Sequence, residues 1–311
     1  MGIPLSFGMP TIALATYAAL PGLAADEHPL ISSLARLGLH AEPAVWDDAS
    51  IDWSRYDAAV IRSCWDYHLR AVEFFDWVER VERLGVAVWN PPPILRWNSR
   101  KTYLRDLAAA GVRTVPTIWV DPLAVTNETS LASLLEVTGW THCVVKPVVS
   151  ASAHDTWKLS RADASDDPLH DTRLHRIAAG PGAMVQPLLT EITTDGEWSL
   201  QFFGGSFSHA VVKRAAPGEF RVQREFGGTF ERLDAPPSIV RQAEAALRAA
   251  PGRTIYGRVD GCVVGDDFIV TELELLEPAL FLDADPAAPD RFASAIAQEV
   301  AGLSSRAEGS G

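Results

Sequence analysis

Two predicted strands in the last third of the chain carry carboxylates at positions that could hold a metal ion. Residues 256–264 and 268–275 alternate like paired antiparallel strands, with Gly265–Asp267 as the loop between them. In such a hairpin the strands pair from Val264 and Phe268 onwards. This register decides which charged side chains face one another.

In that register Asp260 lies opposite Glu272, and Arg258 lies opposite Glu274. Because side chains alternate, Asp260, Glu272 and Glu274 share one face of the hairpin. Like charges opposite one another destabilise a sheet, and a hard divalent cation such as Mg²⁺ would compensate them. The alternative is a solvated acidic face that Arg258 partly neutralises. The apolar Leu275 that follows favours a partly buried metal site, where unpaired charge is costly.

Two lysines occupy positions suited to binding an anion. Lys146 ends the apolar strand predicted at 142–146 and precedes a proline, so its ammonium group would project towards a cleft. Lys101 falls in the first turn of a helix predicted at 99–110, where the helix dipole disfavours a cation. A bound phosphate would explain that placement. The alternative for each is an ordinary surface lysine.

Two other segments, residues 148–155 and a basic group around 213–221, are predicted to contact phosphate. Small and hydroxylated residues between 148 and 155, among them Ser152, could form a lid whose amides and hydroxyls reach phosphate. Lys213 and Arg221 belong to a basic group in the antiparallel half, for which the alternative is a solvated face.

A polar segment, Arg62–Tyr67, follows a predicted buried strand. Ligands of open α/β sheets bind beyond the carboxyl ends of the strands. Arg62, Ser63, Trp65 and Asp66 are therefore candidate contacts to a small polar substrate. The alternative is that Arg62 and Asp66 simply pair with each other on a loop.

The elements that must position these residues divide the chain in two. The first part alternates strands and helices, which indicates a parallel, doubly wound sheet, with strands predicted at 11–16, 57–61 and 86–89 and helices at 29–37 and 71–84. Pro91–Pro93 break this pattern and mark the first domain boundary. The later part contains hairpins, with Gly204-Gly205 as the turn between strands at 198–203 and 206–213. We expect an α/β protein with domains at 9–97, 98–188 and 189–303.

Composition restricts the class of protein. The chain has 311 residues, 47% of them hydrophobic and 22% charged, which is typical of a globular protein. Its net charge of −13 argues against a nucleic-acid partner. Residues 11–25 resemble a signal-peptide core, but no Lys or Arg precedes them and a proline interrupts them, so a buried strand is expected. No apolar run approaches the length of about 18 residues of a membrane span. Three cysteines without metal-type spacing suggest the cytoplasm.

Taken together, these residues resemble the ATP-grasp ligases over about residues 95–282. The resemblance implies an N-terminal doubly wound domain followed by two α+β lobes that enclose ATP. It also implies an ATP- and Mg²⁺-dependent enzyme, with Mn²⁺ as a substitute, acting on a small amino-acid-like substrate. Separately from the resemblance, a homodimer through the first domain is the assembly we expect. It assigns phosphate contacts to Lys101, Lys146, Ser152 and Lys213, adenine contacts to Gln186, Pro187 and Leu188, ribose to Glu191, and metal to Asp260, Glu272 and Glu274.

The reaction implied is activation of a substrate carboxylate as an acyl phosphate, which an amine then attacks. Arg258 or Arg221 would stabilise the acyl phosphate, and Arg62 would hold a substrate carboxylate. Arg62–Tyr67 and Glu272–Pro278 are most similar to the O-ureido-D-serine cyclo-ligase group, which forms D-cycloserine. The alternatives are an intermolecular carboxylate–amine ligase, a small-molecule kinase and a non-catalytic nucleotide-binding protein.

Overall fold

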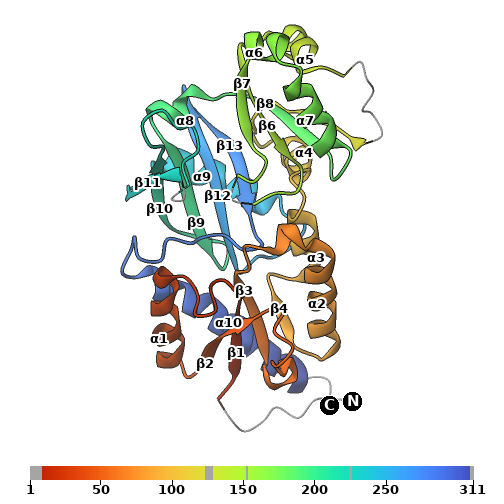
Figure 1. Ribbon diagram of the computed structural model, residues 1–311. Coiled ribbons are helices and arrows are strands. Elements are labelled where there is room, and N and C mark those ends of the chain that lie inside the picture. The colour runs from red at the N-terminus through yellow and green to blue at the C-terminus, as the bar shows by residue number, and fades with distance from the viewer. Residues whose placement is uncertain (1–8, 123–128, 152, 224–225, 309–311) are drawn as a thin grey trace.

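The computed structural model describes residues 9–122, 129–151, 153–223 and 226–308, which form three β-sheets (Figure 1). The first sheet is parallel, in the order β2-β1-β3-β4, and consists of β1 (Thr11–Thr16), β2 (His40–Val45), β3 (Ala58–Ser63) and β4 (Ala87–Trp89). Strand β2 was not predicted, because Pro43 interrupts its pattern. Proline is tolerated there because β2 is an edge strand.

Helices cover both faces of this sheet, which confirms the doubly wound prediction. Alternate residues of β1 point to opposite faces. Ile12 and Leu14 pack with α1 (His28–Arg36) and with α10 (Ala288–Glu308). Ala13 and Ala15 pack with α2 (Ala71–Arg83), which brings Phe74 and Trp77 to the other face.

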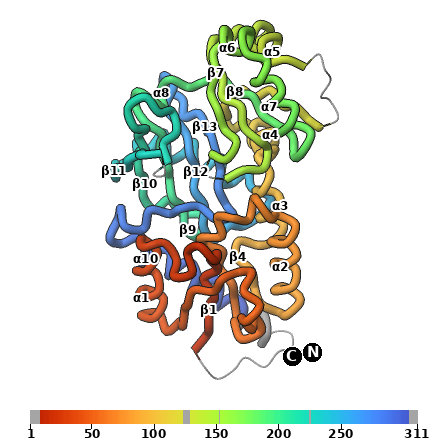
Figure 2. The backbone as a smooth tube through the Cα atoms, in the orientation of Figure 1, coloured from red at the N-terminus to blue at the C-terminus, as the bar shows by residue number. Residues whose placement is uncertain are grey.

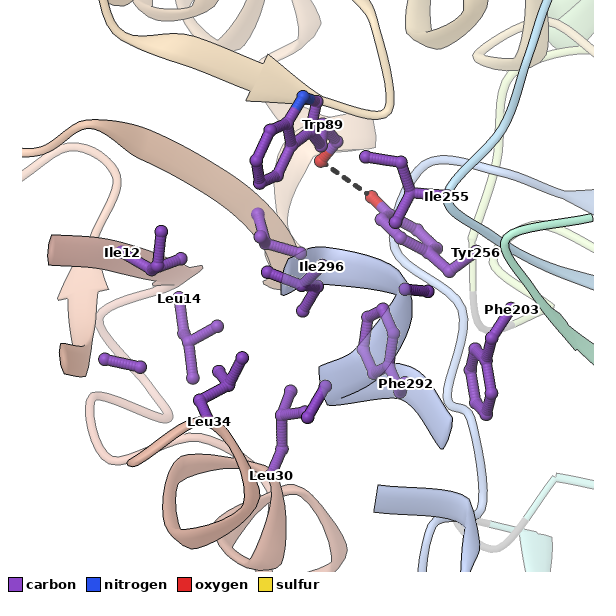
Figure 3. Packing of buried hydrophobic residues seen from close by; sticks show 14 of the residues in the cluster. Ile12, Leu14, Leu30, Leu34, Trp89, Phe203, Ile255, Tyr256, Phe292 and Ile296 are labelled. Atoms are coloured by element: carbon purple, nitrogen blue, oxygen red, sulfur yellow. Dashed lines mark hydrogen bonds between the residues drawn. The ribbon is translucent and has the colours of Figure 1, made fainter. Parts of the chain in front are cut away.

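The position of α10 differs from the predicted domain division. Phe292 and Ile296 of this last helix lie in the same core as Ile12 and Leu34, and Figure 3 shows them together. A helix within the expected domain 189–303 thus shares a core with the first sheet. Periodicity reveals that a helix is amphipathic but not which sheet it covers.

The second sheet is antiparallel, in the order β5-β8-β6-β7, and consists of β5 (Ile118–Val120), β6 (His142–Pro147), β7 (Trp157–Ser160) and β8 (Ala183–Pro187). One face is covered by α5 (Leu131–Thr138), α6 (Arg161–Asp166) and α7 (Leu169–Ala178). Cys143 and Val145 point to these helices. The intervening Val144 and Lys146 point to the opposite face, where the cleft lies.

The third sheet is antiparallel, in the order β11-β10-β9-β12-β13, and consists of β9 (Glu197–Phe203), β10 (Ser206–Arg214), β11 (Thr229–Arg232), β12 (Tyr256–Val264) and β13 (Asp267–Glu274). Its apolar face packs on α4 (Tyr103–Ala109) and α9 (Pro237–Arg248). The predicted turn Gly204-Gly205 joins β9 to β10, and both glycines have positive φ, as that turn requires.

The segment around the triple proline also differs from the prediction. Pro92 and Pro93 begin a helix, α3 (Pro92–Asn98), because proline is well suited to the first turn. Lys101 then lies in the turn between α3 and α4 rather than inside a helix. The remaining short elements are α8 (Thr190–Thr194) and the 3-10 turns Ala25–Glu27, Trp53–Arg55 and Tyr67–Leu69. Among the described residues, no helix is both long enough and apolar enough to span a membrane.

Candidate active site

A cleft of about 440 Å³ lies between the second and third sheets and extends to the N-terminal domain. The second sheet contributes Lys146 and Gln186, and the third contributes Asp260 and Glu272. Trp65 and Tyr67 enter from the loop after β3. The faces of two sheets that do not carry helices thus meet across one polar space.

The three predicted metal-binding carboxylates are adjacent in this cleft. One oxygen from each of Asp260, Glu272 and Glu274 lies within 4.8 Å of the others. The predicted pairs Asp260–Glu272 and Arg258–Glu274 are confirmed.

The predicted loop, however, is one residue too long. Val264 pairs with Asp267 rather than with Phe268, across a two-residue turn in which Gly265 has a φ of +63°. An irregularity between Asp260 and Gly261 then shifts the register back. A bulge of this kind adds one residue to one strand, so the charged pairs beyond it match the simple hairpin again.

Asp260 is at the centre of the charge network. Arg258 donates to both of its carboxylate oxygens at 2.9 Å, Ser199 Oγ donates at 2.6 Å and Lys213 Nζ donates at 3.0 Å. Burial opposes ionisation, but the Arg258 and Lys213 cations hold the pKa of Asp260 well below its usual range. Lys213 also pairs with Glu197 at 2.9 Å.

Two lysines act on Glu272, Lys101 by direct contact and Lys146 through its charge. Lys101 forms an ion pair with Glu272, and its backbone N–H donates to Val148 O at 2.8 Å. Burial opposes ionisation of Glu272, but Lys101 and Lys146 hold its pKa below the usual range. Burial and the nearby Lys101 ammonium lower the pKa of Lys146 to about 8.

The negative charges of Glu274 and Glu277 are not fully offset by neighbouring cations. Burial, together with Glu272 and Asp260, raises the pKa of Glu274 to about 8, although Arg258 opposes the shift. Burial and Glu272 likewise raise the pKa of Glu277 to about 7. A doubly charged cation would supply the positive charge that this group of acids lacks, so the donor set fits Mg²⁺ or Mn²⁺.

Most of the predicted site residues line this one cleft. They are Trp65, Lys101, Lys146, Gln186, Pro187, Leu188, Lys213, Arg221, Arg258, Asp260, Glu272 and Glu274. Arg221 pairs with Glu219 at 2.7 Å and lies over the ring of Phe226, with its guanidinium carbon 3.5 Å from the ring centre. Ser152 lies outside the described residues.

Arg62 and Ser63 were wrongly placed in the cleft. Arg62 is 0% exposed and donates to Glu27 at 2.8 Å, and Ser63 Oγ donates to the same carboxylate at 2.6 Å. Strand β3 continues through Ser63, so Arg62 is a strand residue whose side chain points into the protein. It therefore has no room to hold a substrate carboxylate.

Asp66 and Glu191 are also absent from the described lining of the cleft. Asp66 accepts hydrogen bonds from Trp46 Nε1 at 2.9 Å and from Arg70, so it pairs on its loop with Arg70 rather than with Arg62. Glu191 lies on α8, where the neighbouring Ile192 and Thr193 face the cleft instead.

Several cleft residues were not predicted from the sequence. Glu197 and Glu277 both line the cleft, and Ser199 supports Asp260 from β9. Pairing of β9 with β12 places Ser199 directly opposite Asp260. Hairpin reasoning pairs β9 only with β10, so this contact had no local signal. Glu277 could have been noticed as a further acid two residues after the apolar Leu275.

Comparison with known proteins agrees with this site. The cycloserine biosynthesis protein DcsG of Streptomyces lavendulae is 34% identical over 305 residues, covering 94% of this chain and 99% of that protein. The chain belongs to the DcsG family of ATP-grasp ligases. A family profile described as D-cycloserine synthetase DcsG, N-terminal domain, matches residues 12–90 of this DcsG-family chain. The predicted resemblance is therefore confirmed.

Solved structures support the same family and fold. A crystal structure of D-cycloserine synthetase DcsG is 31% identical to this family member, with a TM-score of 0.83 over 93% of this chain and 99% of that one. D-alanine–D-alanine ligase from Bacillus anthracis is 14% identical, with a TM-score of 0.68 over 98% and 100% of the two chains, and shows the fold alone. The predicted ATP-grasp fold is confirmed, and this DcsG-family protein is an ATP-dependent ligase.

Proposed function

We propose that this enzyme activates the carboxylate of an amino-acid-like substrate with ATP and closes a ring within that substrate, with O-ureido-D-serine as the first candidate. The observation that carries this proposal is the 34% identity to cycloserine biosynthesis protein DcsG, which extends over 94% of the chain. The cleft, which is lined by five cationic side chains, supports it.

Binding of Mg·ATP would replace ion pairs between cleft side chains with contacts to the metal ion and to the phosphates. Asp260, Glu272 and Glu274 would hold Mg²⁺, which supplies neutralisation of phosphate charge. Lys101 would leave Glu272, and Lys213 would leave Asp260, to contact phosphate oxygens. Lys146 would join them from β6. Gln186, Pro187 and Leu188 line the part of the cleft assigned to adenine.

Ring closure then follows in two steps whose atoms balance. A carboxylate oxygen of the substrate attacks the γ-phosphorus, and ADP leaves with the electrons of the broken P–O bond. A nitrogen of the same substrate attacks the acyl carbon, phosphate leaves, and the nitrogen loses its proton. In O-ureido-D-serine this ring nitrogen still carries a carbamoyl group, and hydrolysis of that group by water, which releases carbon dioxide and ammonia, completes D-cycloserine. Arg258 and Arg221 both line the cleft and would stabilise the acyl phosphate oxygens. Exclusion of water prevents hydrolysis of that intermediate.

The decisive experiment measures ADP release with Mg·ATP and O-ureido-D-serine alone, and product mass by mass spectrometry. Turnover to a ring with one substrate supports the proposal. Turnover only when a second amine is added would identify an intermolecular ligase instead. A stable phosphorylated product would identify a kinase. We place the reaction in the cytoplasm, which agrees with the three free, buried cysteines.

A further inference from the structure

The segment that follows β13, residues 276–281, is held at each of its backbone carbonyls; we call it the strap. Figure 2 shows the chain after β13 crossing between the N-terminal domain and the third sheet on its way to α10. Its carbonyls accept hydrogen bonds from side chains of both: Leu276 from Tyr256 at 2.8 Å, Glu277 from Trp65 at 3.2 Å, Pro278 from Arg62 at 2.9 Å, Ala279 from Arg258 at 2.9 Å, and Leu280 and Phe281 from His209 at 3.1 Å.

Arg62 is the more deeply buried of the two cations among these donors, 0% exposed against 7% for Arg258. Its guanidinium is held by Glu27, donates to Pro278 O and lies 4.9 Å from the ring centre of Tyr256. A buried ion pair contributes little net stability compared with apolar side chains of similar volume, because both charges must be desolvated. What distinguishes the Arg62 guanidinium is its geometry. Because its N–H groups lie in one plane at fixed angles, it fixes the orientation of the Pro278 carbonyl.

This direction matters for the cleft. Leu276, Glu277, Ala279 and Phe281 line it, whereas Arg62 and Tyr256 do not. The carbonyls of Leu276 and Pro278 are therefore turned away from the cleft. Those of Glu277 and Ala279 are capped by Trp65 and Arg258, which line it. A wall that presented carbonyl oxygens would repel a substrate carboxylate, since such oxygens only accept hydrogen bonds.

We propose that Arg62, oriented by Glu27, is a positioning residue that sets the strap as the wall of the substrate-carboxylate subsite. The inference rests on the proposed function for the identity of the substrate. Through the hydrogen bond from Arg62 to Pro278, the N-terminal domain contacts the segment that follows Glu274, one of the proposed metal ligands.

The test uses the full-length enzyme and the double variant Arg62→Met/Glu27→Gln, which removes both charges and leaves neither unpaired. Arg62→Lys, which keeps the charge but loses the fork, serves if the double variant fails to fold. Asp290→Asn is the matched control, because it removes the ion pair of α10 with Arg36 and does not touch the strap.

Hydrogen exchange followed by mass spectrometry should show amides of residues 276–283 exchanging about tenfold faster in the variant, with β1 and β3 unchanged. The KM for O-ureido-D-serine should rise about tenfold, while the KM for Mg·ATP stays within about twofold. The control should leave both unchanged. Unchanged strap exchange, or equal rises in both KM values, would overturn the proposal.

The two proposals fail in different ways. Absence of turnover by the wild-type enzyme with O-ureido-D-serine would refute the proposed function. The exchange measurement then decides the role of Arg62 alone: faster exchange confined to the strap supports it, and exchange that rises equally throughout the N-terminal domain overturns it.

Discussion

Replacing Lys146 with Arg should remove a pH dependence from nucleotide binding. Burial and the Lys101 ammonium lower the pKa of Lys146 to about 8 in the free protein, and bound phosphate would raise it. Below pH 8 the ammonium is already charged. Above pH 8 binding must take up a proton, so the Kd for Mg·ATP rises about tenfold per pH unit from this residue.

The magnitude follows from the charged fraction. With a pKa of about 8, Lys146 is about 90% charged at pH 7 and about 10% charged at pH 9, whereas arginine stays charged throughout. The ratio of the wild-type Kd to the Lys146→Arg Kd should therefore rise about tenfold between these two pH values. Glu274, whose raised pKa is also about 8, titrates in both proteins and cancels in the ratio.

Isothermal titration calorimetry of Mg·ATP binding at pH 7, 8 and 9 provides the measurement. Repeating the pH 8 titration in buffers of different ionisation enthalpy gives the protons taken up. The wild type should take up about half a proton more than the variant at pH 8. A ratio that stays constant from pH 7 to 9 would refute the reasoning, since Lys146 would then titrate outside this range or not contact phosphate.

Three other substitutions test the site and its supports. Glu272→Gln should lower turnover about 100-fold or more while circular dichroism stays unchanged, and wild-type activity would contradict the metal assignment. Gly261→Ala places a methyl group 2.5 Å from a backbone oxygen of β13 and should cost about 1–3 kcal/mol in denaturant unfolding; Gly22→Ala, with nothing within 4 Å, is the control. Tyr256→Phe removes a hydrogen bond to the strap and should lower the unfolding free energy by about 1–3 kcal/mol; an unchanged midpoint would show that the bond contributes nothing.

The sequence predicted the features that depend on local pattern. Alternation and glycine turns were enough to pair Asp260 with Glu272, and the end of an apolar strand was enough to direct Lys146 towards a cleft. They were enough because neighbouring residues on a strand and its hairpin partner obey short-range geometry. Even there, the predicted turn was one residue too long at Gly265. The charged pairs were still correct because the register shift between Asp260 and Gly261 cancels this error.

The features that were missed depend on residues far apart in the chain. The position of Arg62 at a strand end suggested a ligand contact, but its partners are Glu27 and Pro278, which are 35 and 216 residues away. Ser199 meets Asp260 only because β9 lies between β10 and β12. Local periodicity contains no information on such distant partners.

The return of α10 to the first sheet bears on the order in which the chain can fold. Phe292 and Ile296 complete the core that Ile12 and Leu14 begin, so the N-terminal domain lacks one of its covering helices until the chain has been synthesised beyond residue 296 (Figure 3). Because α10 follows the strap in the chain, it can cover this face only after the strap has been synthesised.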